Sequence, residues 1–197
     1  MTDQKRPYTM KRRAELEQAT RERITESAVH LHGTLGPVRT SIGAVAAHAG
    51  VRRSTVYRHF PDEAALFRAC TAHWMESNPV PDLAAWAAYE DPDERLSCAL
   101  LELYAYYRAT RSMLENLYRD EGLATSVAQL FSGFRDYLEA ARATLMAGRG
   151  ARGRARRRVG AAVGHAIAFA TWRSLAIDQE LDDDEVVELM RSLVAAA

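Results

Sequence analysis

Apolar residues recur every three or four positions through most of the chain, which is the spacing that turns one side of an α-helix toward a core. Residues 11–32 follow this pattern with Ile24, Ala28 and Leu31 on one face. Gly and Pro are sparse, and a composition rich in Ala, Leu, Arg and Glu favours helix. The pattern predicts an all-α protein.

Breaks in this pattern predict about nine to ten helices. Glycines and a proline at residues 33–37 end the first helix, because they favour turns and cannot continue it. The predicted helices span residues 11–32, 42–49, 52–59, 62–74, 82–89, 93–109, 111–119, 122–147, 154–178 and 182–196.

A proline-containing stretch at residues 77–82 marks a possible domain boundary. We expect residues 1–10 to form a disordered basic tail, residues 11–75 a small head and residues 76–197 a larger helical body. The first 75 residues hold 12 Lys and Arg against 7 Asp and Glu, and the remainder holds 14 against 19. A net charge of zero therefore hides a basic head and an acidic body, which suggests different partners.

The chain has no feature of a membrane or secreted protein. Its longest stretch without a charged residue, 159–172, has 14 residues and is too short to cross a bilayer. The N-terminus lacks the apolar core of a secretory signal. Cys70 and Cys98 form no C-x-x-C pair and are expected to be reduced thiols. We therefore expect a cytoplasmic protein.

Residues 42–60, IGAVAAHAGVRRSTVYRHF, have the spacing of a helix-turn-helix. Two helices that cross steeply need a small residue where their backbones approach, a glycine in the turn and an apolar residue that packs back from the second helix. Ala46, Gly50 and Val56 supply these three at the required offsets.

The second helix of this motif has a basic outer face. A recognition helix in the major groove needs donors for base edges and phosphates, and no carboxylates to repel the backbone. The alternative is an ordinary Ala-rich hairpin with a solvated basic face. Because the spacing, the basic face and the basic head coincide, we favour DNA binding. The outward residues are Arg52, Arg53, Ser54, Thr55, Tyr57, Arg58 and His59.

The stretch TSIGAVAAHAGVRRSTVYRHFPDEAALF closely resembles the N-terminal DNA-binding domain of TetR-type transcriptional repressors. The segment YRHFP, followed by an acidic and apolar helix start, is quite specific to that family. The resemblance covers residues 16–75 by motif, and the remainder agrees in length and helical layout. It implies a homodimer whose subunits each have a three-helix DNA-binding head and a larger body that binds a small molecule and dimerises.

The resemblance also implies which residues contact DNA. Thr40 or Ser41 would meet a phosphate, and the first turn of the recognition helix would contact bases. Arg53 is the best candidate for direct readout, because Arg can donate a bidentate pair of hydrogen bonds to guanine. The implied set is Thr40, Ser41, Arg52, Arg53, Ser54, Thr55, Tyr57 and His59.

Two positions depart from what the family often shows. Gly43 stands where some members carry a base-reading side chain, and Asp62-Glu63 replaces a frequent Ser-Lys, so that a phosphate-binding lysine is absent. A basic N-terminal arm on the DNA backbone or in the minor groove would compensate; the alternative is a solvated, disordered tail. The basic residues concerned are Lys5, Arg6, Lys11, Arg12 and Arg13.

Aromatic residues concentrate in the body, where an apolar cavity with a few polar groups would suit an aromatic or apolar effector. The competing interpretation is that they are ordinary core residues of a helical domain. The candidate ligand-binding residues are Tyr104, Tyr107, Met113, Leu117, Phe134, Tyr137, His165, Phe169 and Trp172.

Small residues at four-residue spacing in the helix predicted at 154–178 would let a partner helix approach closely. Together with the last helix, this face resembles the four-helix dimer interface of the family. A two-fold dimer would present its recognition helices to a palindromic operator. The candidate interface residues are Gly160, Gly164, Ala168, Thr171, Leu175, Val186, Leu189, Met190 and Leu193.

The arginine-rich run at residues 149–158 is expected to be a solvated, mobile loop rather than a nucleic-acid patch. We expect no metal site, no cofactor and no enzymatic activity, because no metal-ligand cluster, phosphate loop or nucleophile motif is present. The chain is therefore interpreted as a ligand-responsive regulator, most simply a repressor released from its operator by a small molecule. An activator of the same family, a non-specific or architectural DNA-binding protein and a small helical enzyme are the alternatives.

Overall fold

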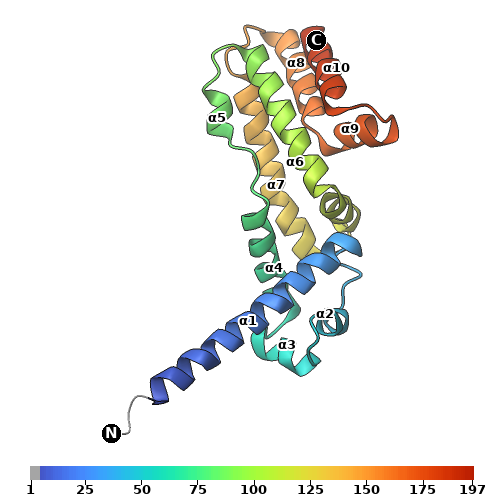
Figure 1. Ribbon diagram of the computed structural model, residues 1–197. Helices are drawn as coiled ribbons and strands as arrows, with labels where there is room; N and C mark the ends of the chain where they lie inside the picture. Colours follow the sequence, from blue (N-terminus) through green and yellow to red (C-terminus); the bar gives the residue numbers. More distant parts are fainter. Residues whose placement is uncertain (1–4) are drawn as a thin grey trace. The chain divides into compact units, whose positions relative to one another are not determined.

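The computed structural model describes residues 5–197, which form two compact units. The all-α prediction is confirmed: this range contains ten α-helices and no strand (Figure 1). One unit comprises the chain up to Ser77 together with Ser112–Ala128, and the other comprises Asn78–Arg111 and Gln129–Ala197. The first break lies close to the predicted boundary, whereas the return of residues 112–128 to the first unit differs from the simple division into 11–75 and 76–197.

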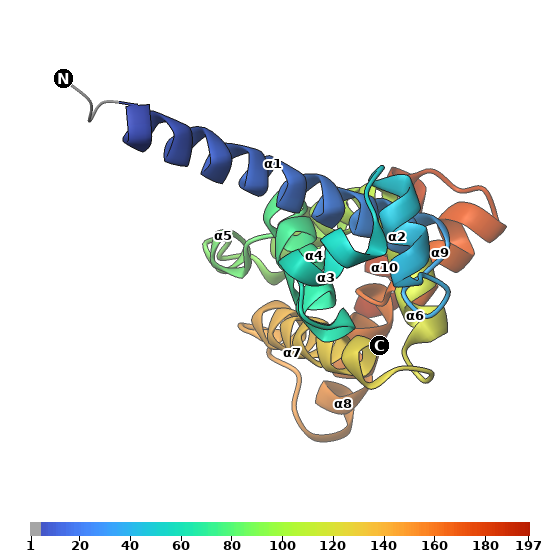
Figure 2. The same cartoon turned by 90° about the horizontal axis from the view of Figure 1, so that it is seen from below.

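The first unit contains α1 (Lys5–Thr34), α2 (Ile42–His48), α3 (Arg53–His59) and α4 (Glu63–Ser77), with the end of α6 and the start of α7. The N-terminal turns of α1 extend beyond α2, α3 and α4 in both views (Figures 1 and 2). This helix begins at Lys5, so residues 5–10 of the predicted disordered tail are helical. Residues 1–4 lie outside the described range.

One apolar cluster holds the first unit together, and each of its four complete helices contributes to it. Val56 of α3 and Ile24 and Ala28 of α1 are fully buried there. The cluster therefore fixes α2 and α3 against α1 and α4. Its buried members are Ile24, Ala28, Ile42, Val45, Ala46, Ala49, Val56, Phe60, Leu66 and Cys70.

The second unit combines two long helices with several shorter ones. It contains α5 (Leu83–Ala87), most of α6 (Pro92–Asp120), most of α7 (Thr125–Met146), α8 (Gly153–Ala166), α9 (Phe169–Arg173), a π-helical turn η1 (Ser174–Asp178) and α10 (Asp183–Ala195). Two helices predicted at 93–109 and 111–119 are one continuous helix, α6. Helices α8 and α10 pack side by side (Figure 1).

The helix predicted at 154–178 is broken, because Ala168 takes an extended conformation between α8 and α9. A break of this kind leaves helix carbonyls without their usual donors. Two buried tyrosines of α6 supply the missing donors: the Tyr104 hydroxyl donates to the Ala166 carbonyl at 2.8 Å, and the Tyr107 hydroxyl to the Ile167 carbonyl at 2.6 Å. The break is therefore stabilised by contacts distant in sequence.

A buried arginine fixes the start of α6 to the end of α7. Arg95 donates to the carbonyl of Tyr89 just before α6, and to the carbonyls of Thr144 and Ala147 at the end of α7. Carbonyls at a helix C-terminus carry partial negative charge, so a guanidinium there is favourable. Within residues 5–197, none of the helices is both long enough and apolar enough to span a membrane.

Candidate nucleic-acid interface

The helix-turn-helix predicted from Ala46, Gly50 and Val56 is present in α2 and α3. Ala46 and Val56 are buried in the core of the first unit. Gly50 has φ +65°, a conformation that side chains disfavour, and it forms the turn between the helices. The Val51 N–H closes this turn by donating to the Ala46 carbonyl at 2.9 Å. The three residues therefore have the roles that their spacing predicts.

The start of α2 distinguishes the two candidate phosphate contacts. Ser41 is the N-cap, and its hydroxyl oxygen accepts the Ala44 N–H at 3.1 Å, which leaves its proton free to donate. The Thr40 hydroxyl instead donates to the Gly36 carbonyl at 2.8 Å. A phosphate only accepts hydrogen bonds, so Ser41 can bind one without losing an existing contact whereas Thr40 cannot.

Helix α3 turns its polar residues outward. Arg52, Arg53 and Ser54 at its start are exposed, as is Tyr57 one turn later. Thr55 and His59 are half-buried. Because Val56 lies in the core, this orientation leaves the basic side of the helix on the surface, as direct contact with DNA requires.

Two arginines of α1 hold the ends of the motif helices, and the sequence pattern did not single them out. Arg21 donates to the carbonyl of His59, the last residue of α3, at 2.6 Å, and its Cζ lies 4.1 Å from the centre of the Phe60 ring. Arg23 donates to the carbonyl of Ala49, which caps α2, at 3.0 Å. Both cations lie at helix C-termini, where they interact favourably with the negative end of the helix dipole. Only the tertiary fold brings them there.

The imidazole of His59 is harder to protonate than that of an ordinary histidine. Burial, and then the charge of Arg58, lower the pKa of His59, with Arg21 acting in the same direction and Glu17 opposing it. The Nε2 atom of His59 is buried with no hydrogen-bond partner. A neutral imidazole donates through one nitrogen only, so a contact with phosphate here would be a hydrogen bond rather than an ion pair.

The last turns of α6 bind the end of α1 and its connection to α2. The Asn116 amide nitrogen donates to the carbonyls of His32 and Gly33, and Arg119 donates to the Leu35 carbonyl at 2.8 Å. The Asp120 carboxylate accepts the Val38 N–H at 3.1 Å. These contacts fix the segment that leads into α2. Sequence reasoning missed them, because side chains that bind a distant backbone leave no local pattern.

Asp120 and Gly36 meet at the centre of this contact. Burial opposes ionisation of Asp120, but hydrogen bonds from Arg119 and the Val38 N–H, with the charges of Arg119 and Arg39, outweigh it and lower the pKa of the carboxyl. Gly36 has φ +97°, and a Cβ there would lie 2.6 Å from the Asp120 carboxylate. The close approach therefore requires glycine.

Most of the candidate ligand-binding residues lie in the second unit, where Tyr104, Tyr107, Phe169 and Trp172 are buried and Phe134 and Tyr137 are half-buried. Tyr107 contacts Phe169 and Trp172, and the Phe134 ring stacks on Tyr137 at 6.1 Å. The hydroxyls of Tyr104 and Tyr107 bind backbone carbonyls, as does that of Tyr137, which donates to Pro81. These hydroxyls therefore already have structural partners.

The remaining candidates do not join these groups. Met113 and Leu117 belong to the first unit, where both are buried. His165 is exposed, and its Nδ1 lies 3.3 Å from the Thr171 hydroxyl. The predicted ligand set is therefore divided between the two units, and His165 faces solvent in the single chain.

The candidate dimer residues are also divided. Gly160 and Gly164 face α7, since added Cβ atoms there would lie 3.8 Å from Met146 and 3.3 Å from Arg142. The small face of α8 thus packs within its own chain, because two helices of one unit meet there. Leu189 and Leu193 of α10 remain 45% and 41% exposed. Thr171, Val186 and Met190 are buried, and Ala168 and Leu175 are half-buried.

The arginine-rich run differs from the loop predicted for residues 149–158. Helix α8 begins at Gly153, so the second half of the run is helical. Arg149 is 11% exposed, pairs with Asp93 at 2.8 Å and donates to the Pro92 carbonyl. This arginine fixes the connection between α7 and α8 to the start of α6.

The helix-turn-helix lies within a segment that matches a known protein family. Residues 24–70 match the family model described as bacterial regulatory proteins, tetR family. No curated protein matches the chain. A TetR-like transcriptional regulator from Rhodococcus sp. RHA1 has 22% identity and a TM-score of 0.66, covering 89% of this chain and 93% of its own.

Other solved structures share the same fold. NalD of Pseudomonas aeruginosa, the secondary repressor of the MexAB-OprM multidrug efflux pump, has 19% identity and a TM-score of 0.63, covering 92% of this chain and 96% of its own. AibR, solved with isovaleryl coenzyme A and operator DNA, has 16% identity and a TM-score of 0.64, covering 88% and 97%. Residues 24–70 therefore match the N-terminal domain of the tetR family of bacterial regulatory proteins, and the chain as a whole shares the all-helical fold of these solved regulators.

Proposed function

We propose that this protein is a ligand-responsive repressor that binds a palindromic operator as a homodimer. The observation that carries the proposal is the orientation of α3. Val56 anchors the helix in the core, while Arg53 and Tyr57 are turned outward. Arg21 fixes its C-terminal end. A helix held at its middle and at its C-terminal end, with a basic outer face, is suited to reading a major groove.

In this proposal, Arg53 reads a base and Ser41 holds a phosphate. An arginine can donate two hydrogen bonds to guanine, which discriminates it from other bases by about 1–3 kcal/mol. Ser41 has a free hydroxyl proton at the start of α2. Arg52, Ser54, Thr55, Tyr57 and His59 would supply the remaining contacts, with His59 acting as a neutral donor.

We propose that dimerisation uses α8 and α10, and that Leu189 and Leu193 lie at its centre. These leucines are one turn apart on α10 and exposed, so a two-fold related copy would bury them. The two recognition helices would then meet half-sites about 34–36 Å apart, or a multiple of that spacing.

The effector would bind the second unit, where the aromatic residues gather, and act in the cytoplasm on DNA-bound protein. Helix α6 belongs to both units: its first part carries Tyr104 and Tyr107, and its last turns hold the α1–α2 connection through Arg119 and Asp120. A ligand that prefers one position of α6 would thereby alter α2 and α3. AibR, solved with both a ligand and operator DNA, supports this pairing of functions by analogy.

The proposal is tested by fluorescence anisotropy with the DNA upstream of the protein's own gene and a shuffled fragment, at two salt concentrations. We expect the native fragment to bind more tightly, and Arg53→Ala to lower this preference by at least about tenfold. Arg68→Ala, an exposed arginine on α4, is the matched control and should keep it. Equal binding of both fragments that weakens together with salt would instead favour a non-specific DNA-binding protein.

A reporter gene behind the bound fragment separates repression from activation. Deleting the regulator should raise expression if it is a repressor. A fall in expression would assign it as an activator while leaving the DNA-binding proposal intact.

A further inference from the structure

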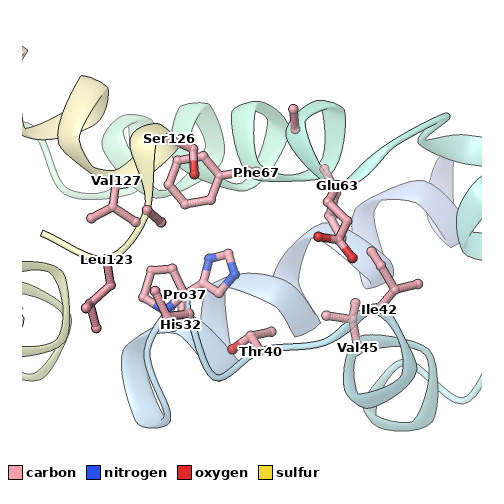
Figure 3. A pocket seen from close by; sticks show the side chains of 14 residues that line it. His32, Pro37, Thr40, Ile42, Val45, Glu63, Phe67, Leu123, Ser126 and Val127 are labelled. Atoms are coloured by element: carbon pink, nitrogen blue, oxygen red, sulfur yellow. The ribbon is translucent and has the colours of Figure 1, made fainter. Parts of the chain in front are cut away.

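A cavity of about 450 Å³ that opens to solvent lies in the first unit, among α1, α2, α4 and the start of α7 (Figure 3). Its volume falls in the range of about 300–1,000 Å³ that is typical of small-molecule sites. The cavity is separate from the aromatic groups of the second unit, since none of the candidate ligand residues lines it.

The walls of this cavity are largely apolar. Ile42 and Val45 come from α2, Phe67 from α4, and Leu123 and Val127 from the start of α7. These side chains suit the hydrocarbon part of a ligand, because burying apolar surface is the main driving force for binding.

The polar groups of the cavity are fewer and carry one charge. Two ionisable residues, His32 and Glu63, are among the described residues that line it. Glu63 is exposed in the first turn of α4 and carries the charge. Burial lowers the pKa of His32 to about 4, so its imidazole is neutral at pH 7. Figure 3 shows His32 and Glu63 at different sides of the space, with the Glu63 carboxylate directed toward Ile42. The cavity is therefore apolar with a negative edge.

We propose that this cavity binds a small amphiphilic cation, with its apolar part against Phe67 and Leu123 and its positive group beside Glu63. An anionic ligand would be repelled by the carboxylate, and a neutral one would gain nothing from it. The charge therefore selects the ligand class, and the apolar wall supplies the general affinity.

An occupant of this cavity would act directly on the DNA-reading helices. It would lie against Ile42 at the start of α2, and α2 precedes the recognition helix by a four-residue turn. A ligand that prefers one spacing of α2 against α1 and α4 would shift the population of operator-binding molecules. This consequence rests on the proposed function, whereas binding of the cation does not.

Calorimetry on the full chain without DNA tests the site. The probes are octyltrimethylammonium, octanol and octyl sulfate, each below its micelle concentration, so that only the head group differs. We expect octyltrimethylammonium to bind about two- to fivefold more tightly than octanol, the ratio that one exposed ion pair supplies. Octyl sulfate should bind more weakly than octanol.

Two variants and a control assign the binding to the cavity. Glu63→Gln should remove the preference for the cation and keep the binding of octanol. Ala64→Phe, at an exposed lining position, should block all three probes, with circular dichroism checking its fold. Glu26→Gln makes the same charge change at an exposed site on α1 and should alter nothing.

The proposal is overturned if no probe binds, if the three probes bind equally, or if Glu63→Gln leaves the preference unchanged. Anisotropy with operator DNA is then measured separately. If the protein binds the cation but no specific DNA, the proposed function is rejected and the cation site is kept. If it binds specific DNA but not the cation, the cation site is rejected and the proposed function is kept.

Discussion

The Arg21 guanidinium on α1 donates a hydrogen bond of 2.6 Å to the backbone carbonyl of His59, the last residue of α3. The same side chain lies over the Phe60 ring, with 4.1 Å between Cζ and the ring centre. The orientation of α3, the proposed recognition helix, therefore depends on a residue 38 positions earlier in the chain. This contact fixes the C-terminal end of α3, while Val56 fixes its middle.

Replacing Arg21 by Ala should destabilise the protein by about 2 kcal/mol, because a charge-assisted hydrogen bond and a cation–π contact are both lost. Urea denaturation measures this change. Arg68→Ala removes an exposed arginine from α4 and should change the unfolding free energy by less than about 0.5 kcal/mol. Equal stability of the two variants would contradict the role assigned to Arg21.

Gly36 should not tolerate a side chain. A Cβ would lie 2.6 Å from the Asp120 carboxylate and closer still to the Arg119 guanidinium, and φ is +97°. We expect Gly36→Ala to cost about 1–3 kcal/mol, as is usual for a strained backbone position. Gly133→Ala is the matched change, since its Cβ would meet nothing within 4 Å in α7, and it should be neutral or stabilising. Thermal unfolding measures the stability of both variants, and equal stability would contradict the constraint at Gly36.

Acid should weaken the first unit through His32. Burial lowers the pKa of His32 from 6.5 to about 4, which the nearby Asp120 carboxylate only partly opposes. Between these values the unfolded chain binds a proton that the folded chain does not, so the unfolding free energy falls as pH falls, by about 3 kcal/mol in total. The stabilising effect is complete above pH 6.5.

The comparison that isolates this effect is His32→Gln, which cannot titrate. Unfolding free energies measured by urea denaturation from pH 7.5 to pH 4 should fall less steeply for the variant than for the parent protein. Parallel curves for the two proteins would show that His32 titrates alike in the folded and unfolded chains, against our expectation.

A charge on the exposed face of α10 should separate the proposed dimer. Leu189→Glu would place a carboxylate at the centre of a two-fold interface, where it would also meet its own copy. Sedimentation should then find monomers with unchanged helicity. Leu101→Glu alters an equally exposed leucine, on α6, and should leave the dimer intact. A dimeric Leu189→Glu protein would move the interface elsewhere.

Local patterns predicted the fold well wherever structure depends on neighbouring residues. The small residue, glycine and valine of the helix-turn-helix took their expected positions, because helix spacing alone decides which side chains can pack at a tight crossing. Ser41, a residue type that helix N-caps prefer, is the N-cap of α2.

Contacts between distant segments were not predictable in this way. The break at Ala168 depends on tyrosine hydroxyls from α6 that bind the freed carbonyls, and the hold of Asp120 on Val38 joins residues 82 positions apart. Neither contact leaves a periodic signal. The same limit explains why Gly160 and Gly164 were assigned to a dimer interface. Small residues at four-residue spacing indicate that another helix approaches closely, but they do not identify that helix as α7 of the same chain.

The central claim, that α3 reads a DNA sequence, is tested most directly by selection from a random duplex library with the full-length protein. We predict enrichment of an inverted repeat with half-site centres about 10 base pairs apart, or a multiple of that spacing. Arg53→Ala should lose the base preference at one position in each half-site while Arg68→Ala keeps it. Recovery of unenriched sequences by the parent protein would contradict the claim.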